Sequence, residues 1–115
     1  MKIYVSLLIG FLLLSSTAFA QFTGPSATGR ISTVTEARSA PVDTYVTLTG
    51  NIVAHLREHY YTFRDQTGEV RVEIEPEVWR SRKIGPDTKA RLVAEVDRNA
   101  AGTIYLWVES LQIVD

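Results

Sequence analysis

The sequence of 115 residues contains no cysteine. Disulfide bonds, a lipid anchor attached to cysteine and chemistry that needs a thiolate are therefore all excluded. The residue patterns of catalysis are missing as well, because there is no glycine-rich phosphate loop, no nucleophile elbow and no HExxH pair of histidines. Scattered carboxylates and two histidines remain. The sequence therefore predicts a protein that is not an enzyme and that has no cofactor.

Long runs of one charge are also missing. The chain has 12 basic and 13 acidic side chains, a formal net charge of −1 and a pI near 6.1. These charges are interspersed and leave no basic run of the kind that binds a nucleic-acid backbone. We therefore expect no nucleic-acid partner.

The longest apolar run lies at the N-terminus. Lys2 gives it a basic start, the run ends at Leu14, and the small residues Ala18 and Ala20 precede a candidate cleavage point. This pattern is typical of a secretory signal peptide, and the run is shorter than the ~20 residues that span a bilayer. We expect residues 1–20 to be removed after Ala20, leaving a periplasmic protein without a membrane attachment.

The rest of the chain reads as one small domain behind a short leader. Residues 21–30 are rich in Gly, Ser, Thr and Pro, which predicts a flexible leader, and residues 31–115 form the domain. Thr33 and Glu36 have the spacing of a capping box, so a short helix is expected through Arg38, ending before Pro41.

From residue 44 onward apolar residues recur with a period of two, which is typical of strands. The predicted strands are 44–54, 60–64, 69–75, 89–97 and 103–114. Gly50 predicts a bulge or sharp bend in the first of them, and a helix over 76–82 carries Trp79 to one end of the sheet. Five strands with a helix between the third and fourth predict an all-β OB-fold, a Greek-key barrel, with an open sandwich as the alternative.

Several of these segments resemble one family. Residues 45–53 (YVTLTGNIV) and 61–68 (YTFRDQTG) resemble the first two strands of the bacterial OB-fold family of periplasmic stress-tolerance proteins. Further similar pieces are 22–26 after the signal, 72–74 with Trp79, and 94–97, where Ala94 replaces a glycine common in the family's pattern. The resemblance implies an exported protein linked to envelope stress, which binds small ligands and has no established catalytic residues.

The candidate ligand site is a face of the barrel. If Val70, Val72 and Ile74 point inward, the residues between them point outward, and in an OB-fold the third strand lies beside the second and fifth. The outward side chains would form one patch: Tyr60, Arg64, Arg71, Glu73, Tyr105 and Trp107. A slip of one residue in register would exchange the two faces.

Aromatic rings suit the C–H faces of sugars, and charged groups bind hydroxyls. The expected ligand of this patch is therefore a small molecule or a cell-wall glycan. Two alternatives stay open: the rings only stabilise strand pairing, or the patch is a docking surface for an envelope protein.

Two histidines give a weaker candidate for a metal site. His55 and His59 flank the first hairpin, and Glu58 lies between them. A structural zinc site usually has four ligands, and Arg57 would repel a cation. We therefore expect no bound metal.

Glu73 and Glu75 have the spacing of an acid pair on one strand face. The neighbouring Arg64 and Arg71 predict a cross-strand salt-bridge ladder in its place. We therefore expect no catalytic residue here.

Overall fold

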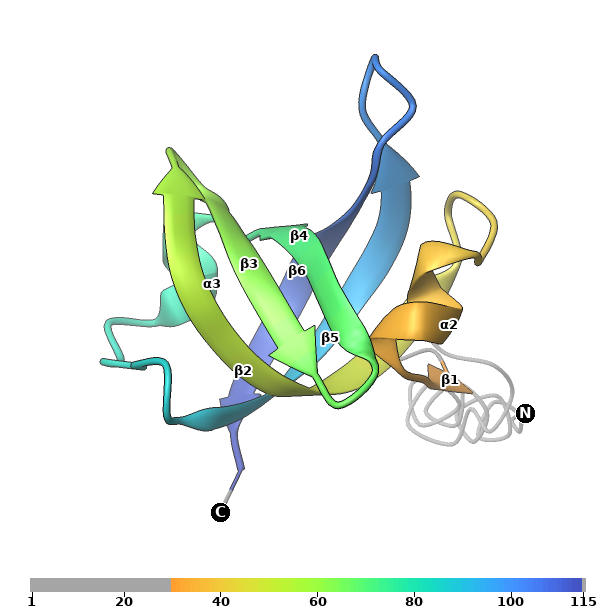
Figure 1. Cartoon of the computed structure of the whole chain (residues 1–115). Helices are drawn as coiled ribbons and strands as arrows, with labels where there is room; N and C mark the ends of the chain where they lie inside the picture. The colour runs from red at the N-terminus through yellow and green to blue at the C-terminus, as the bar shows by residue number, and fades with distance from the viewer. Residues whose placement is uncertain (1–29, 115) are drawn as a thin grey trace, which may run out of the picture.

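The computed structural model describes residues 30–114. The predicted signal peptide, its cleavage point and the predicted leader up to residue 29 lie outside these residues. The elements along the chain are β1 (Arg30–Ile31), α2 (Val34–Arg38), β2 (Tyr45–Arg57), β3 (Tyr60–Asp65), β4 (Gly68–Glu73), α3 (Pro76–Trp79), β5 (Lys89–Arg98) and β6 (Ile104–Ile113) (Figure 1).

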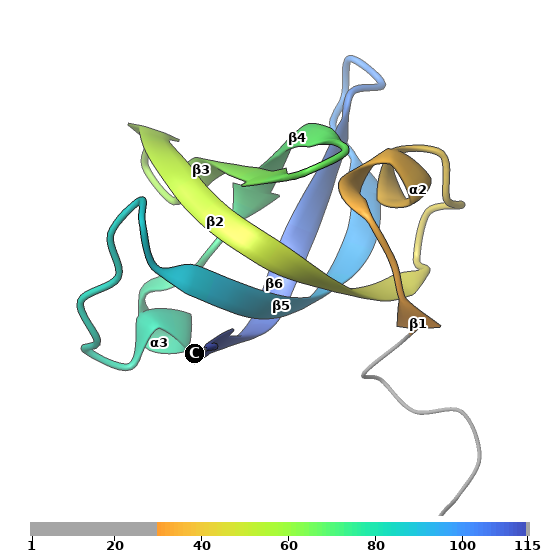
Figure 2. The same ribbon diagram turned by 60° about the horizontal axis from the view of Figure 1, so that its bottom comes forward.

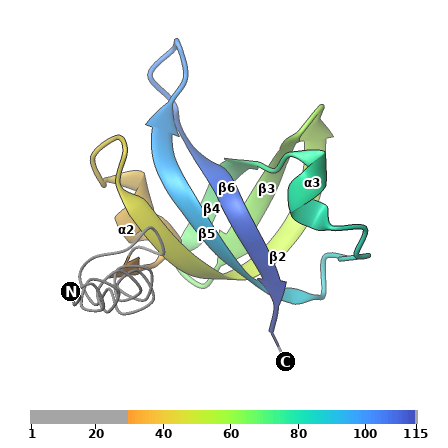
Figure 3. The same cartoon turned by 180° about the vertical axis from the view of Figure 1, so that it is seen from behind.

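Five of the strands close into a barrel. The sheet runs β2-β3-β4-β6-β5, and β5 pairs back onto β2, with β4 and β6 parallel and the other neighbours antiparallel. This closure confirms the predicted OB-fold and excludes the open sandwich. The two helices lie on opposite sides of the barrel, as Figure 1 and Figure 3 both show.

The short strand β1 was not expected from the sequence. It pairs in parallel with Val46 and Thr47 at the start of β2, beside which Figure 2 shows it. The same two residues pair with β5 along their other edge. Two residues are too few to show a period, and their partners lie far along the chain, so only the three-dimensional arrangement defines this strand.

Strand β2 pairs with two different strands along its length. Its first half, up to Asn51, pairs with β5, and its second half, from Asn51 to Arg57, pairs with β3. A Cβ atom placed on Gly50 would lie 2.2 Å from the backbone oxygen of Arg64. Gly50 pairs in regular register with Ala90, and the register shifts of β2 lie further along, between Ile52 and Ala54 and between His55 and Arg57, so the irregularity predicted at Gly50 is misplaced. What Gly50 permits is a close approach of two backbones.

The core follows the alternation of the strands. Phe63 is fully buried near its centre, and Ala94 is also fully buried, so its methyl group fits inside the barrel. Val70, Val72, Ile74, Leu106 and Val108 all point inward as predicted. The opposite side chains of β3, β4 and β6 must then face outward.

Helix α2 closes one opening of the barrel with Val34 and Ala37, which are both fully buried. The predicted capping box is present: the Glu36 backbone N–H donates to the Thr33 hydroxyl at 3.2 Å, and the Thr33 N–H donates to the Glu36 carboxylate at 3.0 Å. Asp65 ties this helix to the turn between β3 and β4, because its carboxylate accepts bonds from the N–H groups of Val34 (2.9 Å) and Thr67 (2.7 Å).

Helix α3 ends earlier than the predicted 76–82. Arg80 and Ser81 have φ values of 54° and 61°, which are left-handed and cannot continue a helix. The Arg82 side chain then donates to the carbonyl oxygens of Val78 and Trp79, both at 2.9 Å. The third predicted strand is shorter too, since β4 ends at Glu73. None of the helices within residues 30–114 is long and apolar enough to cross a membrane.

Candidate ligand-binding face

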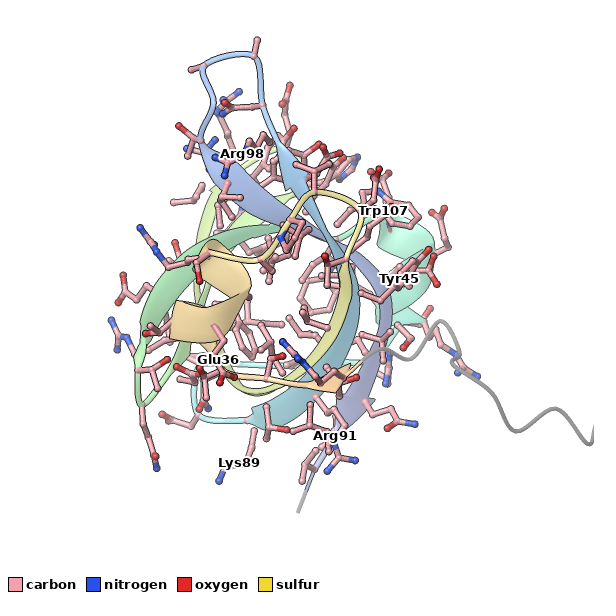
Figure 4. The ribbon with its side chains drawn as sticks, turned by 90° about the vertical axis from the view of Figure 1, so that its right-hand side faces the viewer. Glu36, Tyr45, Lys89, Arg91, Arg98 and Trp107 are labelled. Atoms are coloured by element: carbon pink, nitrogen blue, oxygen red, sulfur yellow. The ribbon has the colours of Figure 1, made fainter. Side chains whose placement is uncertain are left out.

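The outward side chains form a row that crosses five strands. Tyr60 lies opposite Glu73, Glu73 opposite Trp107, Trp107 opposite Glu95, and Glu95 opposite Tyr45. We call these five residues the belt. Side chains directly opposite each other on one sheet face are neighbours, so rings and carboxylates alternate around the barrel. Figure 4 shows Tyr45 and Trp107 at neighbouring positions on one side of the barrel.

A second row lies beside the belt and consists of Thr62, Arg71, Tyr105 and Asp97. The Tyr105 hydroxyl donates to Asp97 Oδ2 at 3.3 Å, and the Tyr105 ring meets the edge of Tyr60 with centroids 6.2 Å apart. The Arg71 guanidinium stands 5.7 Å from the centre of the Tyr60 ring. The structure therefore brings five of the six predicted residues together: Tyr60, Arg71, Glu73, Tyr105 and Trp107.

Arg64 is the exception. It faces outward, but it lies opposite Glu69, with which it forms an ion pair, and its Nε donates to Glu69 Oε2 at 2.7 Å. It lines a different cavity of about 480 Å³, near Thr49 and Lys89. It therefore lies on the predicted outer face, one outward pair beyond Thr62 and Arg71, because alternation identifies a face but not a position along the strand.

The predicted salt-bridge ladder is also wrong. Arg64 binds Glu69, and Arg71 stands over Tyr60. Glu75 approaches His59 at 3.9 Å, and within residues 30–114 Glu73 forms no ion pair. Glu73 therefore has no ion-pair partner in the described part of the chain, although the nearby His59 acts to lower its pKa.

Neighbouring acids shift the pKa values of this face. Burial raises the pKa of Glu73, and Glu75 raises it further through a side-chain hydrogen bond and charge repulsion. Burial likewise raises the pKa of Glu95, with further contributions from Asp43, Asp97 and Glu109. The pKa of the Tyr45 phenol is raised chiefly by Glu109, to which its hydroxyl donates at 3.3 Å. Each shift has the sign that burial and neighbouring negative charge both produce.

Sequence reasoning missed Tyr45, Glu95, Asp97 and Glu109. A signal for two of them was present, because Glu95 and Asp97 alternate with Leu92, Ala94 and Val96 in one strand. The alternation shows that they face outward, but only the register of β5 against β6 places them beside Trp107 and Tyr105.

A groove adjoins the two rows. In Figure 1 the β2–β3 and β5–β6 hairpins rise on either side of β3 and β4. Between them lies a cavity of about 330 Å³, to which Thr62 and Arg71 of the second row contribute, together with Leu56 and Ile104. The strand face between these two loops is the position at which OB-folds bind oligonucleotides and oligosaccharides.

The two histidines do not form a common site. His55 Nε2 lies 2.8 Å from the Glu58 carbonyl oxygen, and its ring stacks on Tyr61 with centroids 4.7 Å apart. His59 faces Glu75 instead. Across residues 30–114 no three His, Cys, Asp or Glu side chains are grouped so that they could hold a metal ion.

A closed five-stranded barrel with a helix between its third and fourth strands defines an OB-fold domain, here with aromatic and charged side chains on its outer face. Residues 15–112 match the family described as bacterial OB fold (BOF) protein. The chain belongs to this family, which confirms the resemblance seen in the sequence.

Two relatives and two solved structures are similar to this chain. The calcium-regulated OB-fold protein CarO of Pseudomonas aeruginosa is 42% identical over 86 residues, 75% of this chain and 74% of CarO. Protein YgiW of Escherichia coli K12 is 35% identical over 89 residues, 68% of each chain. The E. coli YgiW structure has a TM-score of 0.72 at 32% identity and covers 81% of this chain and 97% of its own. The telomere capping protein Ten1 from S. pombe, at 10% identity and a TM-score of 0.56 over 74% of this chain and 80% of its own, shares the fold alone.

Proposed function

We propose that this protein is a non-enzymatic binding module of the periplasm, of the stress-tolerance type, which holds a small molecule or an envelope oligosaccharide. The observation that carries the proposal is the belt, in which three aromatic rings and two carboxylates are aligned across five strands. Rings at regular intervals offer stacking surfaces, and the carboxylates between them accept hydrogen bonds from hydroxyl or amino groups.

The groove next to the belt supports the same proposal. Leu56 and Ile104 give it apolar walls, and Thr62 and Arg71 give it hydrogen-bonding groups. Pockets for small ligands commonly combine apolar lining with a few polar groups that fix orientation. A ligand lying along the belt would reach the groove through Arg71.

Binding should change the fluorescence of Trp107. The chain has two tryptophans, and Trp79→Phe leaves Trp107 as the reporter on the belt. Titration of this variant with glycan fragments and small envelope metabolites should shift the emission for at least one compound. Trp107→Ala should weaken that binding about tenfold or more, as expected for the loss of a central aromatic contact, and calorimetric titration measures this because the substitution removes the reporter.

The control is a test of folding. The far-ultraviolet circular dichroism spectrum and the melting temperature of both variants should match those of the parent protein. A complete panel without any spectral response would contradict the proposal. Co-purification of one stable protein partner at this face, with no small ligand, would favour the adaptor alternative.

Export is tested separately. The protein recovered from the periplasm should have an intact mass that begins at Gln21, because Ala18 and Ala20 fit the small-residue positions before the cut. Ala18→Arg should block this processing, whereas Ser15→Ala should not. A full-length mass for the unaltered exported protein would contradict the predicted cleavage.

A further inference from the structure

The belt places acidic groups on both sides of Trp107. Glu73 on β4 and Glu95 on β5 are the two direct neighbours of Trp107 on β6. Each has a second acid beside it, because Glu73 interacts with Glu75 and Glu95 interacts with Asp43. Two pairs of carboxyl groups therefore flank one indole ring.

Among these acids only Glu75 has an ion-pair partner in the described part of the chain, His59 at 3.9 Å, which also acts to lower the pKa of Glu73. Within residues 30–114 the ion pairs are Arg57–Glu58, His59–Glu75 and Arg64–Glu69, and none includes Glu73, Glu95 or Asp97. Asp97 accepts from the Tyr105 hydroxyl and from the Arg98 backbone N–H, neither of which cancels its charge. The face is therefore complementary to a cation.

At one end of the belt, the Tyr60 ring already contacts positively charged groups of the protein. The guanidinium groups of Arg57 and Arg71 stand 5.5 Å and 5.7 Å from the centre of the Tyr60 ring, within the range of a cation–π contact. In the described part of the chain no cation stands over Trp107, although an indole is the ring that attracts cations best. Trp107 is half-buried, so part of the strongest cation acceptor of the belt remains accessible to a ligand.

The spacing of the acids limits the shape of that ligand. Glu73 and Glu95 are separated by two strand intervals, which is about 10 Å across the sheet. Oxygen ligands of a metal ion converge on one point at roughly 2–2.6 Å, so this arrangement does not suit a single metal ion. Two separate positive groups joined by a spacer fit the arrangement better.

We propose that the belt binds an organic cation with two ammonium groups separated by a spacer rich in C–H groups. The spacer lies on Trp107, one ammonium group binds at Glu73, and the other binds at Glu95 and Asp43. Two sources share this chemistry: an oligomer of amino sugars with free amines, and an aliphatic oligoamine. The inference rests on the proposed function, since it specifies the ligand of the same face.

The experiment compares charged and uncharged ligands of the same shape. The Trp79→Phe variant is titrated at pH 6 with the tetramer of glucosamine, with the tetramer of N-acetylglucosamine and with spermidine, and Trp107 emission is recorded. We expect the glucosamine tetramer or spermidine to bind at least ten times more tightly than the acetylated tetramer. Affinity should also fall as salt is raised, because the contacts are between charges near the surface.

The matched variants test the two carboxylates. Glu73→Gln combined with Glu95→Gln should lower affinity for the cationic ligand at least tenfold, whereas Asp87→Asn, in the turn before β5, should leave it unchanged. The double variant should melt no lower than the parent, since it removes groups that repel their neighbours. This melting temperature separates a loss of binding from a loss of folding.

The outcomes separate this inference from the proposed function. If the acetylated tetramer binds as tightly as the charged ligands and the double variant keeps full affinity, the cation inference is overturned and a neutral-ligand module remains. If no compound binds the face, both are overturned. Tight binding of only the glucosamine tetramer or only spermidine supports the inference and identifies the source.

Discussion

Replacing Gly50 by alanine should destabilise the domain by about 3 kcal/mol or more, or prevent it from folding, which is the upper part of the range for overpacked sites. The added Cβ would lie 2.2 Å from the Arg64 backbone oxygen and 3.0 Å from the tip of the Phe63 ring. Phe63 is fully buried and cannot swing away, and the Arg64 carbonyl belongs to the neighbouring strand. The clash is relieved only if β2 and β3 move apart.

Urea unfolding followed by tryptophan fluorescence measures this effect as a lower midpoint with an unchanged slope. Since small domains are stable by only about 5–15 kcal/mol in total, the loss should be obvious. Gly85→Ala is the matched control, because a Cβ there meets nothing within 4 Å, and it should change stability by less than about 0.5 kcal/mol. If Gly50→Ala unfolds at the same midpoint as the parent, the close approach of the two strands does not exist.

The same glycine shows why much of the fold could be predicted from the sequence. A glycine within a long period-two segment is a local signal of a bend, and the capping box of Thr33 and Glu36 is a local signal of a helix start. The capping box is present in the structure, and Gly50 lies where two backbones approach closely, although the register shifts of its strand come a few residues later. By contrast, β1 depends on a pairing with Val46 and Thr47, and no pattern within two residues announces such a contact.

The candidate site was predictable to a smaller extent. The alternation of the strands correctly predicted that Tyr60, Glu73 and Trp107 face outward. The strand order of an OB-fold correctly predicted that they are neighbours. It could not show that Glu95 and Tyr45 extend the same row, because this depends on the register of β5 against two neighbours. One register shift, between Val93 and Ala94, lies within that pairing, and a sequence gives no means of placing it.

This difference matters for function. The patch predicted from the sequence lacked Glu95 and Tyr45. Its charged residues were two arginines and one acid, and it suited a neutral sugar. With Glu95, Asp97 and Glu109 added, the same rings lie in a field of negative charge. The register therefore changes the class of ligand that the face is expected to prefer.

The loss of Asp65 is the second large effect that we expect. Its carboxylate accepts from the backbone N–H groups of Val34, Thr67 and Gly68 and from the Thr67 hydroxyl, so it joins α2 to the turn between β3 and β4. Hydrogen bonds to charged groups contribute about 1.5–3 kcal/mol each, and water can replace only the exposed ones. Asp65→Ala should therefore lower the free energy of unfolding by about 3 kcal/mol at pH 7. Asp65→Asn, which keeps one acceptor oxygen, should lower it less.

This effect should depend on pH in a definite direction. Burial alone would raise the pKa of Asp65, but the hydrogen bonds from Thr67, Val34 and Gly68 outweigh it, and the pKa is lowered below its usual value. A carboxyl whose folded-state pKa is depressed contributes stability that is fully present above its unfolded pKa of about 3.9 and is lost as the pH falls through the folded value. The difference in unfolding free energy between the parent and Asp65→Ala should therefore shrink between about pH 5 and pH 2.

Urea unfolding of both proteins across this pH range measures the difference directly. Asp87→Asn is the control, since within residues 30–114 the Asp87 side chain makes no hydrogen bond or ion pair, and it should follow the parent at every pH. A difference that stays constant down to pH 2 would show that Asp65 acts through packing alone. A shrinking difference would show that one ionised carboxylate holds the helix that closes the barrel to the turn beneath it.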